Sequence, residues 1–316
     1  MKCLVTGATG FVGGAVARAL LKQDGAETIV TAVRRLSSAL PVEIKQVLVG
    51  DLLADTDYSA ALKGVDVVIH AAARVHIMGD NAGGSLAEFR RVNVDGTLNF
   101  ARQAAAAGVK RFVFISSIKV NGESTDAGQA FTPNDIVTTQ DAYALSKWEA
   151  EQGLFDLGHK TGMEIVVIRP PLIYGPGVKA NFKKMIAWVK RGVPLPLGAA
   201  HNKRSLVALD NLVDFIVLCT HHPKAANQIF LISDHEDVST TELIQKVAKA
   251  MGKKAYLLPV PVGLMIFMAK LLGKEDIAYR LFGSLQVDSS KARELLDWKP
   301  VITMDEQLKK TVEDYK

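Results

Sequence analysis

The amino-acid sequence predicts an α/β protein in which a doubly wound parallel sheet is followed by a smaller α/β lobe. Through the first half of the chain, short and continuously apolar runs alternate with segments of helical periodicity. This alternation is typical of a parallel sheet covered by helices on both faces. One apolar run leads directly into a glycine-rich turn near the amino terminus. After about residue 175, Gly, Pro and Lys become frequent and the elements become shorter.

The elements of the first half can be placed in chain order. The apolar runs expected as strands are 2–6, 28–33, 46–50, 66–73, 110–117 and 163–171. The segments expected as helices are 11–23, 85–108 and 141–155. We therefore expect a sheet domain over 1–175 and a smaller lobe over 176–316, with chain crossings between the two.

Composition excludes several classes of protein. Hydrophobic residues make up 48% of the 316 residues, which is enough for a sizeable core. The net charge of +5 is spread along the chain without a basic run, which favours small anionic ligands and gives no support for nucleic-acid binding. Two cysteines, Cys3 and Cys219, fall in core patterns, so we expect a reducing compartment and no metal site. The opening "MKCLVTGATG" leaves no room for a signal peptide, so we expect a cytoplasmic protein.

The glycine turn "VTGATGFVGG" predicts a dinucleotide site. Gly7, Gly10 and Gly13 lie between a strand and a helix, where glycines allow a tight turn and a close approach of the backbone to a pyrophosphate. The amino end of the helix offers free N–H groups to phosphate.

The second strand ends in Arg34 and Arg35, where an acid would bind the ribose of NAD and a cation would bind the 2′-phosphate of NADP. The sequence therefore favours NADP, with NAD as the alternative if both arginines point to solvent. Asp51 is expected near the adenine, and His70 to Ala73 are expected to line the nicotinamide side of the crevice.

Tyr143 and Lys147 lie one helical turn apart, and Ser116 and Ser117 end a central strand. A phenol is a poor base at neutral pH unless a nearby ammonium lowers its pKa. With a serine hydroxyl to orient the reacting oxygen, this pattern predicts proton exchange with a substrate hydroxyl or carbonyl.

In combination, "TGATGFVG", "HAAA", "VNVDGT", "FISSIKVNG", YxxxK and "RPPLIYGPG" resemble the extended short-chain dehydrogenase/reductase family, in particular its nucleotide-sugar epimerase/dehydratase group. The resemblance covers nearly the whole chain. It implies a Rossmann domain, a carboxyl-terminal nucleotide-sugar lobe, and catalysis by Ser117, Tyr143 and Lys147. The expected cofactor-binding residues are Gly7, Thr9, Gly10, Phe11, Val12, Arg34, Arg35, Asp51, Leu52, Ala71, Ala72, Ala73, Asn93, Tyr143, Lys147 and Pro170. The expected substrate-binding residues are Ser117, Asn181 and Phe182 in a nucleotide-binding loop, and Arg204 at the pyrophosphate.

The sequence also departs from the pattern of the family. Dehydratases of the group carry Asp-Glu beside the catalytic serine, where this chain has Ile118 and Lys119, so dehydration is not expected. Many epimerases carry an asparagine where this chain has Leu172, which leaves the substrate contact at that position open.

Four functions are compatible with these patterns. The arginines favour NADPH-dependent reduction of the C4 keto group of a UDP-linked 6-deoxy-hexosamine, in surface polysaccharide synthesis. The alternative is an NAD-dependent 4-epimerase of UDP-hexose or UDP-N-acetylhexosamine. A reductase of small apolar ketones and a redox-sensing binding protein are further alternatives. The sugar, the nucleotide and the C4 configuration of the product stay open.

Two expectations concern surfaces. The helices at about 85–107 and 141–157 are expected to form a homodimer, as in many relatives. The apolar stretch 256–272 is too short to span a bilayer, so it is expected to be a core helix or a pocket wall, with contact to a membrane surface as the alternative.

Overall fold

The computed structural model describes residues 1–23, 28–75, 85–126 and 128–315. Its larger unit is a seven-stranded sheet with the order β3-β2-β1-β4-β5-β6-β9, in which all neighbouring strands are parallel. The strands are β1 (Lys2–Thr6), β2 (Thr28–Val33), β3 (Lys45–Leu48), β4 (Val67–His70), β5 (Arg111–Ile115), β6 (Glu164–Arg169) and β9 (Gln228–Leu231). The order reverses between β1 and β4, and this is the place where doubly wound sheets bind ligands.

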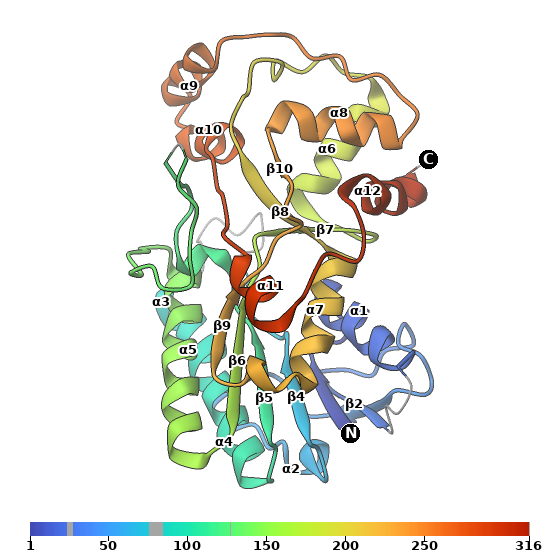
Figure 1. Ribbon diagram of the computed structural model, residues 1–316, viewed down its shortest axis with the longest axis vertical. Coiled ribbons are helices and arrows are strands. Elements are labelled where there is room, and N and C mark those ends of the chain that lie inside the picture. Colours follow the sequence, from blue (N-terminus) through green and yellow to red (C-terminus); the bar gives the residue numbers. More distant parts are fainter. Residues whose placement is uncertain (24–27, 76–84, 127, 316) are drawn as a thin grey trace.

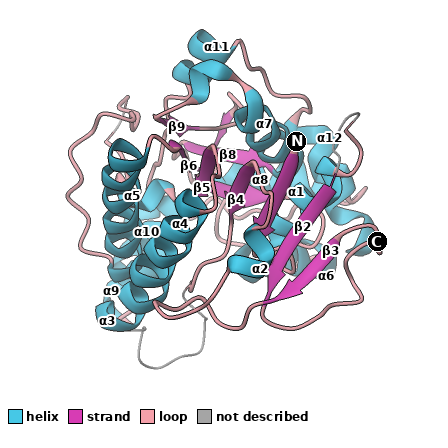
Figure 2. Ribbon diagram, turned by 90° about the horizontal axis from the view of Figure 1, so that it is seen from below, coloured by secondary structure: helices cyan, strands magenta, loops and turns pink. Residues whose placement is uncertain are grey.

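Helices cover both faces of this sheet, as the sequence predicts. One face carries α1 (Phe11–Leu20) and α7 (Leu209–His221). The other carries α2 (Ser59–Leu62), α4 (Thr97–Ala106) and α5 (Ala142–Thr161). Figure 2 shows α4 and α5 on one side of the strands and α7 on the other.

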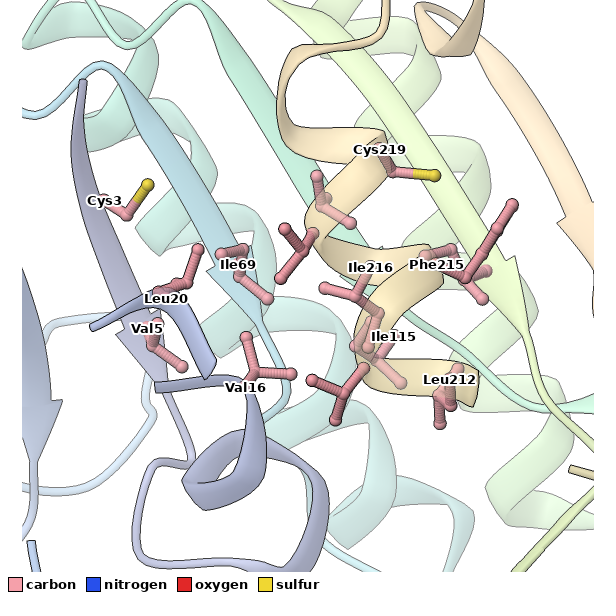
Figure 3. Close-up of a cluster of buried hydrophobic side chains, with 14 of the residues drawn as sticks. Cys3, Val5, Val16, Leu20, Ile69, Ile115, Leu212, Phe215, Ile216 and Cys219 are labelled. Carbon is pink, nitrogen blue, oxygen red and sulfur yellow. The ribbon is translucent and has the colours of Figure 1, made fainter. Parts of the chain in front are cut away.

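Alternate residues of each strand serve the two faces. In β1, Cys3 and Val5 pack toward α1 and α7, whereas Leu4 packs toward α4 and α5. Because the central strands β1, β4, β5 and β6 are buried on both faces, their runs are apolar throughout rather than alternating, whereas the edge strand β3 is partly exposed. Figure 3 shows the core between the sheet and the helices α1 and α7. In this core Cys3 and Cys219 are both buried and both free thiols, as expected for core residues.

Segments from the second half of the chain complete the first unit. Strand β9 pairs with β6, and α7 packs against α1, although both follow residue 176. The helix α11 (Ser290–Leu296) packs near β9 as well. A cut at residue 175 therefore does not separate two independent pieces of chain.

The smaller lobe lies at the upper end of the molecule in Figure 1. Its three-stranded sheet has the order β10-β8-β7, from β7 (Leu172–Tyr174), β8 (Arg204–Ala208) and β10 (Asp237–Val238). Its helices are α6 (Ala180–Arg191), α8 (Thr240–Ala250), α9 (Val262–Leu271), α10 (Glu275–Phe282) and α12 (Met304–Val312).

Short helical turns complete the described chain. They are α3 (Leu86–Phe89), the π-helix η1 (Arg90–Gly96), and the 3-10 helices η2 (Ile118–Val120), η3 (Pro223–Ala225) and η4 (Glu313–Tyr315). In the described part of the chain, no helix combines the length and apolar character needed to cross a membrane. The same residues contain no group of three or more His, Cys, Asp or Glu side chains arranged to hold a metal ion.

Candidate active site

The glycine turn joins the end of β1 to the start of α1 in a geometry that only glycine tolerates. Gly7 has a φ of +69°, and a Cβ there would lie 2.8 Å from the backbone of Ala71 and Ala72. The N–H of Gly10 donates to the carbonyl of Gly7 over 2.8 Å, and a Cβ on Gly13 would lie 2.4 Å from the same oxygen. The turn therefore brings β1, the end of β4 and α1 into direct backbone contact.

The amino end of α1 is open to an anion. Gly10 is the N-cap and offers no side-chain acceptor to the first N–H groups of the helix, which belong to Phe11 and Val12. Thr9 and Gly10 are exposed. Unpaired N–H groups and the positive end of the helix dipole suit a phosphate. The turn and the helix end therefore fit the pyrophosphate of a dinucleotide.

His70 does not line the crevice, contrary to the expectation from the sequence. Its ring is fully buried and stacks 5.8 Å from Phe114. Burial, and then the charge of Lys147, lowers the pKa of His70 to about 3, so the ring is neutral. Its Nδ1 lies 2.7 Å from Thr6 Oγ1, and that oxygen accepts from the N–H of Ala72 over 3.2 Å. His70 thus supports the half-buried Ala71–Ala73 backbone from behind.

Asn93 connects the segment after β4 to the helix that carries Tyr143. It is buried in η1, and its side chain accepts from the N–H of Arg74 over 2.8 Å and donates to the carbonyl of Arg74 over 3.1 Å. The same amide donates to Ser146 Oγ over 3.0 Å, and Ser146 Oγ donates to the carbonyl of Tyr143 over 2.7 Å. Since π-helical turns occur often at functional sites, η1 is a second signal for this region.

Helix α5 carries Tyr143 in its first turn and Lys147 in its second, on one face. The carboxylate of Asp141 caps the helix. Lys147 is only 1% exposed, and its Nζ lies 3.9 Å from the ring centroid of Phe114. Burying an ammonium costs free energy of folding, and a purely structural role for Lys147 would not require a charge there. A buried lysine one helical turn from a tyrosine is therefore typical of a functional site.

Burial changes the pKa of both titrating groups of this pair. Desolvation, with a smaller effect of Asp141, raises the pKa of Tyr143 to about 12. Desolvation lowers the pKa of Lys147 to about 7, and the carboxylate of Glu151 acts in the opposite direction. Without ligands the tyrosine is therefore a neutral phenol, and the lysine changes its charge near neutral pH.

The structure distinguishes the two serines at the end of β5. Ser116 is buried, and its hydroxyl donates to the carboxylate of Glu151. Ser117 is half-buried in extended backbone, and its Oγ accepts from the N–H of Lys119 over 3.2 Å. The carbonyl of the buried Pro170 accepts from the N–H of Ile118 over 3.0 Å and fixes this turn. Of the two serines, Ser117 is the accessible one.

A buried ion pair lies behind these residues and does not follow from the sequence motifs. Arg169 at the end of β6 bonds Glu151 of α5 with its Nη2 2.5 Å from Oε2, and both side chains are almost completely buried. Arg169 Nη1 also donates to Asn121 Oδ1 over 3.0 Å. The sequence gives one indication of this pair: Glu151 lies four residues after Lys147, on the same helical face as the candidate catalytic residues.

A cleft of about 380 Å³ opens beside the first turn of α5. It is lined by Asn121, Gly122, Glu123, Ser124, Phe131, Thr138, Thr139, Gln140 and Asp141. Lys119 lies at its edge, with Nζ 3.1 Å from Asp141 and 2.8 Å from Glu123. The position at which dehydratases carry an acid is thus held by a lysine in a salt bridge.

Arg204 begins β8, and its guanidinium donates through Nη1 to the carbonyls of Arg280 and Gly283 over 3.1 and 3.0 Å. No carboxylate of the described residues forms a salt bridge with it, and desolvation lowers its pKa.

Asn181 and Phe182 lie in the first turn of α6 and not in a loop. Asn181 is exposed, whereas Phe182 is 3% exposed and stacks on Tyr174 at 5.8 Å, so its side chain belongs to the core of the lobe.

At the edge of the sheet, Arg34 and Asp51 form a salt bridge over 3.5 Å and are 77% and 69% exposed. Arg35 is exposed as well. Leu52 follows Asp51, and its carbonyl would lie 2.5 Å from a Cβ on Gly96, so this loop packs closely on η1. The last residues of the "HAAARVHIM" segment, 76–78, lie outside the described residues.

Comparison with known proteins places the chain in a family. Residues 3–233 match the model of the NAD dependent epimerase/dehydratase family. A UDP-glucose 4-epimerase of Vibrio cholerae is 48% identical over 99% of this chain and 94% of that protein. An Escherichia coli O157:H7 protein, N-acetyl-alpha-D-glucosaminyl-diphospho-ditrans,octacis-undecaprenol 4-epimerase, is 28% identical over 86% of this chain and 81% of its own length.

Solved structures share the fold. The UDP-N-acetylglucosamine 4-epimerase of Bacillus cereus has a TM-score of 0.79 at 21% identity, covering 98% of this chain and 97% of that one. The family match spans most of the chain, including the glycine turn, Ser117, Tyr143 and Lys147. The chain is therefore an enzyme of the extended short-chain dehydrogenase/reductase type and belongs to the NAD dependent epimerase/dehydratase family.

Proposed function

We propose that the protein is a 4-epimerase of a UDP-linked hexose or N-acetylhexosamine. The observation that carries this proposal is the 48% identity to a UDP-glucose 4-epimerase along almost the whole of both chains. The geometry of α5 and β5 suits an epimerase and a ketoreductase equally, because both exchange a proton at the C4 oxygen. The end-to-end similarity thus favours the epimerase over the ketoreductase that the sequence patterns placed first.

The side chains of this protein have separate tasks in the proposed reaction. The hydroxyl of Ser117 holds the C4 oxygen, and Tyr143 takes the proton from the C4 hydroxyl and later returns one. The charged form of Lys147 stabilises the phenolate of Tyr143 and so opposes the burial that raises the phenol pKa. A bound nicotinamide supplies the acceptor and donor of hydride at C4. Arg204 has no salt-bridge partner among the described residues and pairs with the diphosphate of the substrate.

We propose NAD as the cofactor. Arg34 already lies beside the carboxylate of Asp51, so a 2′-phosphate would share that arginine with an anion. An epimerase also regenerates its cofactor in each turnover and does not draw on a pool of reducing equivalents. The residues that would hold the dinucleotide are those of the glycine turn, Ala71–Ala73, Asn93, Asp51 and the pair on α5.

The experiment is to incubate the purified protein with UDP-glucose and, separately, with UDP-N-acetylglucosamine, without a reductant. We expect conversion to the C4 epimer without net change in cofactor absorbance. Oxidation of added NADPH by a UDP-4-keto-6-deoxy-hexosamine, with no epimer formed from either sugar, would favour the ketoreductase instead. That second candidate rests on exposed Arg35, which forms no salt bridge with a described carboxylate.

A homodimer through α5 and the neighbouring α3–η1–α4 segment stays a prediction. These elements pack against one another in the structure, and Arg90 of η1 donates through Nε to Glu149 of α5 over 2.8 Å. Light scattering of the purified protein tests it, and a monomer at micromolar concentration would contradict it.

A further inference from the structure

Helix α9 is apolar around its whole circumference and yet has no buried residue. Its sequence is VGLMIFMAKL, with Lys270 as the only charged side chain. A helix that is hydrophobic on every side is normally enclosed by a protein core or by lipid. The sequence-based expectation of a core helix is thus wrong, because the described lobe covers α9 only in part.

Exposed apolar side chains lie on α9 and also in the chain segments directly before and after it. We call this set the tip surface, and its large members are each between 47% and 66% exposed. They are Tyr256, Leu258, Leu264, Phe267, Met268, Leu271, Leu272 and Tyr279. In Figure 1, α9 and α10 lie together at the outer end of the lobe, far from the seven-stranded sheet. A patch of this kind marks an interaction site.

The charges of the chain segment that carries the tip surface favour an anionic partner. Residues 253–280 contain five basic and two acidic side chains. Lys253, Lys254 and Lys274 are exposed, although the Nζ of Lys253 donates to the carbonyl of Lys190 over 2.6 Å. Lys270 forms a long salt bridge of 3.7 Å with Glu275. Apolar and aromatic side chains bordered by lysines are typical of helices that lie in the interface of an anionic bilayer.

The length of α9 is compatible with a helix that lies on a bilayer without crossing it. The positive charge of the segment disfavours a second copy of the chain as the partner. Ten residues of helix are about 15 Å long, which is too short to cross a hydrocarbon core of about 30 Å. Two tip surfaces facing one another around a two-fold axis would bring two sets of lysines together. Anionic headgroups would instead neutralise them.

We propose that the tip surface docks the protein on an anionic membrane surface. The candidate substrate site lies next to this surface, because Arg204 bonds the carbonyls of Arg280 and Gly283 at the end of α10. Docking therefore holds the candidate diphosphate site close to the boundary between water and lipid. The proposal does not depend on which sugar is epimerised.

The test is co-sedimentation of the full chain with vesicles of phosphatidylcholine, alone or containing phosphatidylglycerol. We expect binding to the anionic vesicles, weaker binding to phosphatidylcholine, and loss of binding as salt is raised. Leu272→Asp should reduce the partition coefficient by about tenfold or more, because it places a carboxylate in the contact. Val42→Asp is the matched control, since Val42 is 96% exposed and lies outside the tip surface.

Three outcomes would overturn the proposal. The first is a chain that stays in the supernatant with anionic vesicles. The second is equal loss of binding in Leu272→Asp and Val42→Asp. The third is a dimer that Leu272→Asp dissociates while no vesicle is bound, which would make the tip surface a contact between copies. Turnover of a UDP-sugar in solution should be unchanged in both variants, so the failure of this proposal is separate from failure of the proposed reaction.

Discussion

Replacing Lys147 with methionine should stabilise the fold while abolishing turnover. The ammonium of Lys147 is buried, and desolvation lowers its pKa from 10.5 to about 7. Lowering a pKa by one corresponds to about 1.4 kcal/mol, so at low pH the charged lysine costs on the order of 5 kcal/mol relative to the unfolded chain. Methionine has a similar length and no charge, but it loses the contact of the ammonium with Phe114, worth about 1–2 kcal/mol. The net gain should be about 3 kcal/mol.

The dependence of this gain on pH has a definite sign. Between pH values of about 7 and 10.5 the unfolded chain binds a proton at Lys147 that the folded chain does not, so the stability of the natural protein rises with pH. Below the folded pKa both states are protonated and the penalty is complete. The advantage of Lys147→Met should therefore be largest below about pH 7 and should shrink toward about pH 10.

Urea unfolding of the natural protein and the variant, at several pH values across this range, measures the effect. Lys160→Met is the control, because Lys160 is an exposed residue of the same helix and should show no gain that depends on pH. A Lys147→Met variant that is less stable than the natural protein at low pH, or whose gain is constant with pH, would refute the assigned burial and charge.

Three further predictions concern single side chains. Tyr143→Phe should reduce kcat by at least about a hundredfold, with dinucleotide binding unchanged by fluorescence; retained turnover would contradict its assignment as the proton carrier. Arg204→Met should raise KM for a UDP-sugar by about tenfold or more while kcat changes little. Arg280→Met is the control and should leave KM unchanged, because Arg204 donates a hydrogen bond to the backbone carbonyl of residue 280, which this substitution keeps. Glu151→Gln should lower the free energy of unfolding by about 3–5 kcal/mol, because it leaves the buried guanidinium of Arg169 without its counter-charge. An unfolding curve like that of the natural protein would show that the pair is not buried as described.

Features set by the local chain could be predicted from the sequence. The parallel sheet follows from the apolar runs, since a strand buried on both faces has no polar alternation. The glycine turn was predictable because the positive φ of Gly7 and the close approach of Gly13 to its carbonyl leave no room for a side chain. Tyr143 and Lys147 share a helical face by spacing alone.

Features that depend on distant contacts could not be predicted in this way. The partners Glu151 and Arg169 are 18 residues apart in the chain, and only the packing of α5 on β6 brings them together. The same reason explains why His70, an apparent crevice residue, lies among phenylalanines, and why Phe182 fills the core beside Tyr174. Nothing in an apolar run such as 256–272 indicates whether the lobe encloses it.

The most direct test of the proposed epimerase reaction uses UDP-glucose and, separately, UDP-N-acetylglucosamine carrying deuterium at C4, incubated with the purified protein and NAD in ordinary water. We predict that at least one of them gives its C4 epimer with the deuterium kept at C4, observed by NMR, in the natural protein and not in Tyr143→Phe. Formation of the C4 epimer with hydrogen from water at C4, or no conversion of either sugar while a 4-keto sugar is reduced at the expense of NADPH, would contradict the assignment of this site to a 4-epimerase.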